Sequence, residues 1–202
     1  MYKQIVIGID QSYQNTGISI IADGKIKDVK SVQLDKYKNN SERRRALRNK
    51  LSGLIAVVAL KAENIVCVCE RARLHGGPTS FINIDAIKAM GALIATIVDV
   101  CDTYNIPVYS VDTRCWKSQV IGTSKPQSNK YGVPEEKWPT VKWLIQKGFE
   151  QKILVDVTDT KKSKGIFWRG NKKYRYNNDA ADSAGIGMFY CIGDRDKLQI
   201  ER

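Results

Sequence analysis

The sequence predicts an α/β protein in which helices flank a five-stranded mixed sheet. Three observations predict this class: three strand patterns open the chain, two more strand patterns each follow a long helical pattern, and a helical pattern lies near the C-terminus. Strands joined by tight turns pair antiparallel and strands reached through helices pair parallel, so the order β-β-β-α-β-α-β-α indicates both kinds of pairing. The 202 residues contain no internal repeat and no low-complexity linker, which predicts one domain over residues 1–202.

The first strand patterns form a meander. Residues 5–7 begin an apolar strand that ends at Asp10, and residues 17–22 form a second strand. Asp23-Gly24 is a strong signal for a two-residue hairpin turn, and residues 25–34 alternate as a third strand. We therefore expect three consecutive antiparallel strands.

Helices and strands then alternate. Residues 41–61 place apolar side chains at helical spacing, with Ser41 as the expected N-cap. Residues 64–70 predict a buried strand that ends on a carboxylate, residues 84–104 a long helix, and residues 107–111 the fifth strand. Each of these strands is reached through a helix, which predicts parallel pairing.

The last part of the chain is mainly helical. A short helix is expected around Trp116, followed by a polar loop and a helix over about residues 134–147. A final helix is expected over about residues 178–191. Residues 158–176 look like an insertion before that helix.

Composition narrows the function classes. With 43% apolar and 27% charged residues the chain is not mainly disordered. Lys and Arg outnumber Asp and Glu by 33 to 21, and the net charge of +12 predicts a polyanionic partner, nucleic acid before an anionic membrane surface. No apolar run approaches the ~20 residues that span a bilayer, and the first residues lack the pattern of a signal peptide.

The five cysteines indicate a cytoplasmic protein. They lie in apolar contexts or beside Trp116, as small buried residues do in a reducing compartment. Cys67 and Cys69 do not form a zinc pattern, because no second pair lies at ligand spacing.

Four acids lie at predicted strand ends or at the start of the last predicted helix, where open sheets commonly bind ligands. Asp10 closes the first strand, Glu70 closes the fourth, and Asp179 and Asp182 share one face of the last helix. Each acid alone could simply end a strand or favour a helix N-terminus. If the two strands are neighbours, however, all four come together on a basic chain.

Four adjacent carboxylates repel one another unless a cation lies among them. Oxygen ligands without His or Cys select Mg²⁺ or Mn²⁺. Two such ions about 4 Å apart form the clamp used for attack on a phosphodiester, in which one ion activates water and the other holds the departing oxygen.

Motifs along nearly the whole chain resemble those of RuvC-type Holliday junction resolvases, most closely phage-encoded members such as those of lactococcal phages. They are GIDQSYQNTGISI (residues 8–20), the second acid Glu70, FINIDAIKAMGALIATIV (81–98), WKSQVIGTSK (116–125) and NNDAADSAGIGMFY (177–190). The first motif alone is weak because actin-like kinases share it, but the ordered set is specific.

The resemblance implies a ribonuclease H-like fold, a homodimer and two Mg²⁺ ions, for which Mn²⁺ would substitute. It implies that Asp10, Glu70, Asp179 and Asp182 are the catalytic and metal-binding residues. The expected activity is structure-selective cleavage of branched DNA, with Holliday junctions as the first substrate and three-way junctions and forks as further candidates, leaving 5′-phosphate and 3′-hydroxyl ends. The expected location is the cytoplasm, that of a bacterial host if the protein is phage-encoded.

One departure from the family leaves the substrate preference open. Cellular resolvases carry an aromatic residue three positions after the second acid, where this chain has Arg73. Phe81 is an alternative source of the ring, although an aromatic residue before an apolar helix is more often part of the core.

Basic residues mark the expected DNA contacts. Residues 161–176 hold seven basic residues, four aromatics and no acid, a composition that suits a phosphate backbone with exposed bases nearby. The alternative is a solvated hairpin with Trp168 packed inward. The predicted DNA-binding residues are Arg73, Lys117, Lys125, Lys130, Lys161, Lys162, Lys164, Trp168, Arg169, Lys172, Lys173 and Arg175.

Two rival functions share these features. One is a ribonuclease H that acts on RNA–DNA hybrids, and the other is a protein that binds branched DNA without cutting it. An actin-like ATPase or sugar kinase is disfavoured, because the chain lacks a second domain and a further glycine-rich phosphate loop.

Overall fold

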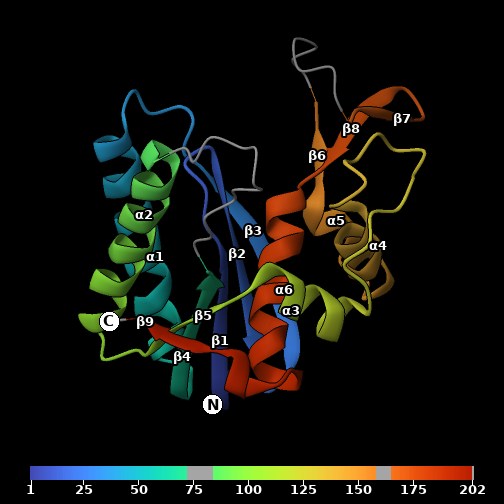
Figure 1. The fold of residues 1–202 in the computed structure, drawn as a ribbon. Coiled ribbons are helices and arrows are strands. Elements are labelled where there is room, and N and C mark those ends of the chain that lie inside the picture. Colours follow the sequence, from blue (N-terminus) through green and yellow to red (C-terminus); the bar gives the residue numbers. More distant parts are fainter. Residues whose placement is uncertain (72–83, 158–164, 202) are drawn as a thin grey trace.

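A computed structural model describes residues 1–71, 84–157 and 165–201 (Figure 1). In chain order its elements are β1 (Tyr2–Asp10), β2 (Asn15–Ala22), β3 (Lys25–Gln33), α1 (Asn40–Ala59), β4 (Ala62–Glu70), α2 (Ile84–Asp102), β5 (Val108–Val111), α3 (Thr113–Trp116), the π-helical turn η1 (Lys117–Ile121), α4 (Trp138–Gln146), α5 (Glu150–Ile153), β6 (Leu154–Asp156), β7 (Phe167–Arg169), β8 (Lys172–Tyr176), α6 (Asn178–Ile192), the 3-10 turn η2 (Arg195–Lys197) and β9 (Gln199–Glu201).

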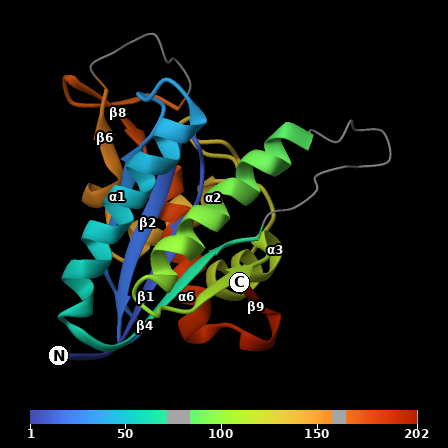
Figure 2. The same ribbon diagram turned by 90° about the vertical axis from the view of Figure 1, so that its left-hand side faces the viewer.

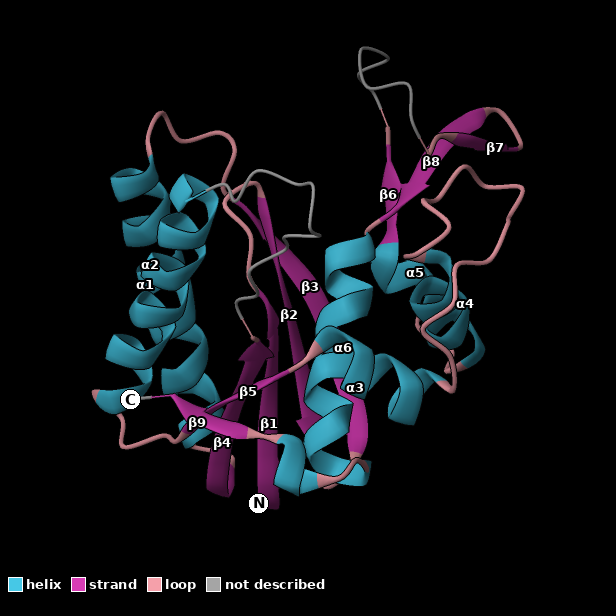
Figure 3. Cartoon of the chain, viewed as in Figure 1, coloured by secondary structure: helices cyan, strands magenta, loops and turns pink. Residues whose placement is uncertain are grey.

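The main sheet has the strand order β3-β2-β1-β4-β5-β9 (Figure 3). Strands β1, β2 and β3 pair antiparallel, β4 lies parallel to β1, and β5 lies parallel to β4. The predicted mixed α/β sheet is therefore confirmed, with six strands in place of five. The additional strand, β9, pairs antiparallel with β5 at the edge. Its three residues are too short for an alternating pattern to be visible in the sequence.

The turn between β2 and β3 has the backbone that the sequence predicts. Asp23 has φ 46° and Gly24 has φ 73°, the two left-handed residues of a type I′ hairpin turn. The tight turn sets the antiparallel register of β2 and β3.

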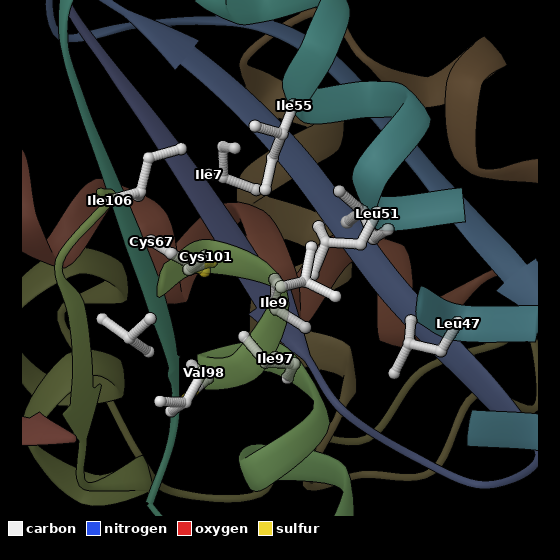
Figure 4. Packing of buried hydrophobic residues seen from close by; sticks show 14 of the residues in the cluster. Ile7, Ile9, Leu47, Leu51, Ile55, Cys67, Ile97, Val98, Cys101 and Ile106 are labelled. Carbon is white, nitrogen blue, oxygen red and sulfur yellow. The ribbon is translucent and has the colours of Figure 1, made fainter. Parts of the chain in front are cut away.

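Helices α1 and α2 cover one face of the sheet (Figure 2). Alternate residues of β1, among them Ile7 and Ile9, pack against Leu51 and Ile55 of α1 (Figure 4). Cys67, Cys69 and Cys101 are buried in this core, as the sequence predicts, whereas Cys115 and Cys191 are only half-buried. Burial of each large apolar side chain contributes about 1.5–3 kcal/mol, which makes this face a stable base for the strand ends.

Helix α6 covers the opposite face and lies very close to β1. A Cβ atom added at Gly8 of β1 would lie 2.2 Å from the carbonyl oxygen of Ser183 and 2.7 Å from the amide nitrogen of Gly187. The glycine therefore lets helix and strand backbones approach closely. This approach sets the depth at which the first turns of α6 lie over the sheet.

The start of α1 differs from the prediction. The N-cap is Asn39 and not Ser41, because the Asn39 Oδ1 accepts from the amide of Glu42 at 2.9 Å and its Nδ2 donates to the Glu42 Oε1 at 3.2 Å. This reciprocal pair resembles a capping box, except that Glu42 accepts from the Asn39 side chain and not from its backbone amide. Ser41 cannot form such a pair, because Glu42 is its immediate neighbour.

A second, three-stranded sheet of order β6-β8-β7 rises above α4, α5 and α6 (Figure 1). Its described part begins at Leu154, earlier than the predicted insertion. Tyr131, in the loop before α4, anchors it: its ring centroid lies 4.9 Å from that of Phe167 and 5.6 Å from that of Tyr176. The sequence predicted neither α5 nor β6, because both are short.

Within the described ranges, no helix is both long enough and apolar enough to cross a membrane.

Candidate active site

Asp10 and Glu70 lie side by side at the ends of two parallel strands. The residues that precede them in β1 and β4 are paired in register. Val6 and Val68 belong to the core under α6, and side chains alternate along a strand, so both acids lie on the α6 face of the sheet. The condition on which the predicted acidic site depended, that these strands are neighbours, is met.

Helix α6 brings the other two acids to the same place. Its N-cap is Asn177, whose Oδ1 accepts from the amide of Ala180 at 3.1 Å. Asp179 and Asp182 follow in the first turns. A Cβ atom added at Gly17 of β2 would lie 1.9 Å from the carbonyl oxygen of Asp179, so this glycine allows the helix start to rest on the strand.

Polar neighbours hold two of the acids in place. The Thr113 Oγ1 donates to the Glu70 Oε1 at 2.6 Å, and the Asn15 Nδ2 donates to the Asp179 Oδ2 at 2.8 Å. The Gln11 side chain brackets the backbone of Glu70, accepting from its amide at 3.1 Å and donating to its carbonyl. These contacts orient the carboxylates before any ligand binds.

Lys137, which the sequence reasoning missed, completes the cluster. Its ammonium forms an ion pair and hydrogen bond with the Asp182 Oδ2 and lies 3.9 Å from the Asp10 Oδ2. Asp182 is 1% exposed, whereas the Lys137 side chain is 32% exposed. The segment Glu135-Glu136-Lys137 contains no pattern that points a lysine inward, so no sequence signal was available.

The pKa shifts follow from this crowding. Burial raises the pKa of Asp10 well above 3.8, Lys137 opposes the rise, and Asp182, Glu70 and Asp179 add to it. Burial also raises the pKa of Asp179, against the hydrogen bond from Asn15 and the charge of Lys137. The pKa of Lys137 is raised: burial opposes its charge, but Asp182 and Asp10 outweigh that opposition. All four acids therefore interact electrostatically within one site.

The donor set suits a hard divalent cation. All four candidate ligands are carboxylates, and the Asp182 Oδ1 is buried without a hydrogen-bond partner in the described part of the chain. In the arrangement described, which omits residues 72–83, 158–164 and 202, no three His, Cys, Asp or Glu side chains are set to hold a metal ion together. The Lys137 ammonium takes the position of a cation beside Asp10 and Asp182, so a metal there requires the lysine to move aside.

The three predicted loop lysines have different positions. Lys125 and Lys130 are exposed. Lys117 is 7% exposed, and its ammonium donates to the carbonyl of Glu136 at 3.0 Å, next to Lys137. Contact of these lysines with DNA stays a prediction. For Lys117 the structure gives a different partner, because the lysine supports the turn from which Lys137 reaches the acids.

The β7–β8 hairpin carries exposed cations and an exposed ring. Trp168 is 64% exposed, so the alternative in which it packs inward is wrong. The Lys173 ammonium lies 4.9 Å from the Trp168 ring centroid, and Arg169 pairs with the Glu150 Oε1 at 2.6 Å. We refer to Lys172, Lys173 and Arg175 as the hairpin cations. The hairpin lies at the end of the molecule where α6 begins (Figure 1).

Some predicted residues lie outside the described ranges. They are Arg73, Phe81, Lys161, Lys162 and Lys164.

Solved structures share the fold. No protein-family model matches the chain, and no curated protein matches it by sequence. Thermus thermophilus RuvC in complex with a Holliday junction substrate matches with a TM-score of 0.57 and 11% identity, over 98% of this chain and 99% of that chain. A second structure of Thermus thermophilus RuvC matches with a TM-score of 0.56 and 12% identity over the same shares. The chain therefore has the ribonuclease H-like fold that the resemblance implies.

Proposed function

We propose that the protein is a metal-dependent endonuclease that cuts branched DNA, with Holliday junctions as the first substrate and three-way junctions and forks as further ones. The convergence of Asp10, Glu70, Asp179 and Asp182 on one face and at one end of the sheet carries this proposal. The net charge of +12 supports a polyanionic substrate. A protein of the same fold is described in complex with a Holliday junction, which supports the choice of branched DNA.

Two Mg²⁺ ions, with Mn²⁺ as a substitute, are the proposed cofactors, and the four acids would hold them. When bound, such ions supply an activated water and stabilise charge on the departing oxygen. The residues of the chain prepare the site for this: Thr113 and Asn15 fix two carboxylates through hydrogen bonds of 2.6 and 2.8 Å. Once displaced from Asp182, the Lys137 ammonium would remain close enough to contact a phosphate at the same site.

The DNA would approach from the side of the β7–β8 hairpin. The hairpin cations and the exposed Trp168 offer charge for the backbone and a ring for an unstacked base. Lys125 and Lys130 add charge on the loop before α4. These residues would extend the contact with a DNA strand beyond the acidic site.

A homodimer is part of the proposal because the resemblance implies one. Helix α2 leaves the small residues Gly91 and Ala95 exposed, which would let a second helix approach closely. Sedimentation of the protein alone tests this. The phage origin and the cytoplasmic location remain predictions from the sequence, as does the single domain.

A substrate panel tests the activity. End-labelled four-way junction, three-way junction, fork, linear duplex and RNA–DNA hybrid are incubated with the protein in Mg²⁺, in Mn²⁺ and in EDTA. We expect metal-dependent nicks near branch points and none on linear duplex. Cuts confined to the hybrid would reassign the protein to ribonuclease H activity, and binding without cuts in either metal would leave a junction-binding protein.

Asp10→Asn separates cleavage from binding. We expect the variant to lose cleavage while junction binding persists or tightens, because one charge that repels phosphate is gone. Asp102→Asn, an exposed aspartate at the end of α2, is the matched control and should cut like the wild type. Loss of both binding and cleavage in a folded Asp10→Asn variant would contradict the assignment of Asp10 to metal.

A further inference from the structure

A polar cavity of about 330 Å³ opens beside the acidic site. It lies between the loop after β1, strand β3, strand β6 and the segment that leads from β8 into α6. Asp179 forms part of its wall. Whatever fills the cavity therefore lies next to any group held at the acids.

Carboxamides are the commonest side chains in the wall of this cavity. They are Gln14, Asn15, Gln33, Asn177 and Asn178. Carboxamides present a donor and an acceptor side by side, as the edge of a nucleobase does, and Asn and Gln commonly pair with adenine in this way. A pocket for an apolar ligand would carry a mainly hydrophobic wall instead.

Hydrogen bonds fix some of these amides and leave others available. Asn177 Nδ2 donates to the Ser31 Oγ at 2.6 Å, and Asn15 Nδ2 donates to the Asp179 Oδ2 at 2.8 Å. The Asn178 Oδ1 is buried, and no described group donates to it. Gln14 and Gln33 are exposed at the rim. The cavity thus combines a rigid base with open donors and acceptors.

Size and charge restrict the occupant. About 330 Å³ is at the small end of the ~300–1,000 Å³ range of ligand pockets, which suits one nucleotide and excludes a duplex. Arg175 supplies a positive charge among the residues that line the cavity. The carboxylates of Asp35 and Asp179 also line the cavity, so Arg175 is the lining residue that can contact a phosphate, while the amides match the edge of a base.

We propose that this cavity is a subsite for one unstacked nucleotide of branched DNA, adenine above the other bases, next to the phosphate held at the acids. The proposal rests on the proposed nuclease function. The base edge contacts the amides of Gln14 and Gln33, and Arg175 contacts a neighbouring phosphate. Asn15 joins this subsite to the acidic site, since its amide group lines the cavity and holds Asp179.

Fluorescence of an adenine analogue that brightens outside the base stack tests the subsite without cleavage. The analogue is placed at successive positions around the crossover of a four-way junction, with the protein at saturation in EDTA. We expect brightening at the position that enters the cavity. A Gln14→Ala/Gln33→Ala double variant should lose most of it and bind the junction about tenfold more weakly, because each lost hydrogen bond weakens binding severalfold. Gln146→Ala, an exposed amide on α4, is the control and should behave as the wild type.

The outcomes separate the subsite from the nuclease function. Equal brightening in the double variant and the wild type would overturn the subsite. A wild type that binds the junction and cuts it in Mg²⁺, but brightens the analogue at no position, would overturn the subsite and leave the nuclease function intact. A wild type that neither binds nor cuts junctions would overturn both.

Discussion

Replacing Lys137 with Met should destabilise the metal-free protein more than the loss of any exposed lysine. The ammonium is bound to Asp182 and lies 3.9 Å from Asp10, and Asp182 is 1% exposed. Without the lysine, Asp182 remains buried with both oxygens unpaired by any described group. Met keeps the length of the side chain, so the change removes mainly the charge.

The expected loss in free energy of unfolding is about 3 kcal/mol. Removing one partner of a buried ion pair costs about 3–5 kcal/mol, because a charge is left buried without compensation. The lower end applies here, since the Lys137 side chain is 32% exposed and water reaches it. Protonation of the acids limits the loss further, because burial already raises the pKa of Asp10.

Urea unfolding in EDTA and in Mg²⁺ measures the effect. Lys142→Met, an exposed lysine on α4, is the matched control and should change stability by less than about 0.5 kcal/mol. Mg²⁺ should restore most of the stability of Lys137→Met and add less to the wild type, because a cation that binds the folded state stabilises it by mass action. Equal losses for the two lysines, or no Mg²⁺ effect on Lys137→Met, would refute the view that this lysine stands in for a metal.

Three further predictions test the packing, the charge and the titration of the site. Gly17→Ala should lower the free energy of unfolding by more than about 2 kcal/mol, because the added Cβ collides with the backbone of Asp179. Gly53→Ala in α1, where a Cβ meets nothing within 4 Å, should raise it by up to about 1 kcal/mol. Thermal unfolding measures both changes. Replacing the hairpin cations with Gln should weaken junction binding and flatten its salt dependence, as binding titrations at several salt concentrations would show. An unchanged slope would mean that the hairpin faces away from DNA. The control replaces three exposed lysines near the opposite end of the sheet, which are Lys3, Lys25 and Lys61. Burial raises the pKa of Asp10 above 3.8, so the folded state holds the carboxyl proton of Asp10 more tightly than the unfolded chain does. The stability of the metal-free protein should therefore fall as pH rises from about 4 through the raised pKa, by up to about 1.4 kcal/mol per pH unit. Asp10→Asn should reduce that slope in urea unfolding at a series of pH values, and an unchanged slope would contradict the assignment.

Much of the fold was predictable because its signals are local. The apolar run of β1, the Asp23-Gly24 turn and the apolar spacing of α1 each depend on neighbouring residues, and the structure confirms the elements they predict. The N-cap of α1 was also readable, since Asn39 lies three residues before Glu42. The prediction of Ser41 is wrong because Ser41 has no acidic residue three positions after it, whereas Asn39 has Glu42.

The missed parts depend on contacts between distant segments. Strand β9 forms through pairing with β5, and three residues give no period by themselves. Lys137 reaches the acids across 45 positions of sequence from Asp182, and the two residues before it are glutamates. A lysine next to acids in the sequence is typical of a solvated surface. Its contact with Asp182 becomes apparent only from the packing of α4 against α6.

The close approach of α6 connects the first sequence motif to the geometry of the site. Gly8 and Gly17 lie on either side of Asp10 in that motif, and a Cβ at either position would collide with the backbone of α6. A chain with the same acids but a larger residue at Gly17 would hold Asp179 farther from Asp10, and four carboxylates that do not converge cannot share a cation. The proposed chemistry therefore depends on the glycines as well as on the acids. The acids supply the negative charge, and the glycines allow the close packing that brings the four carboxylates together.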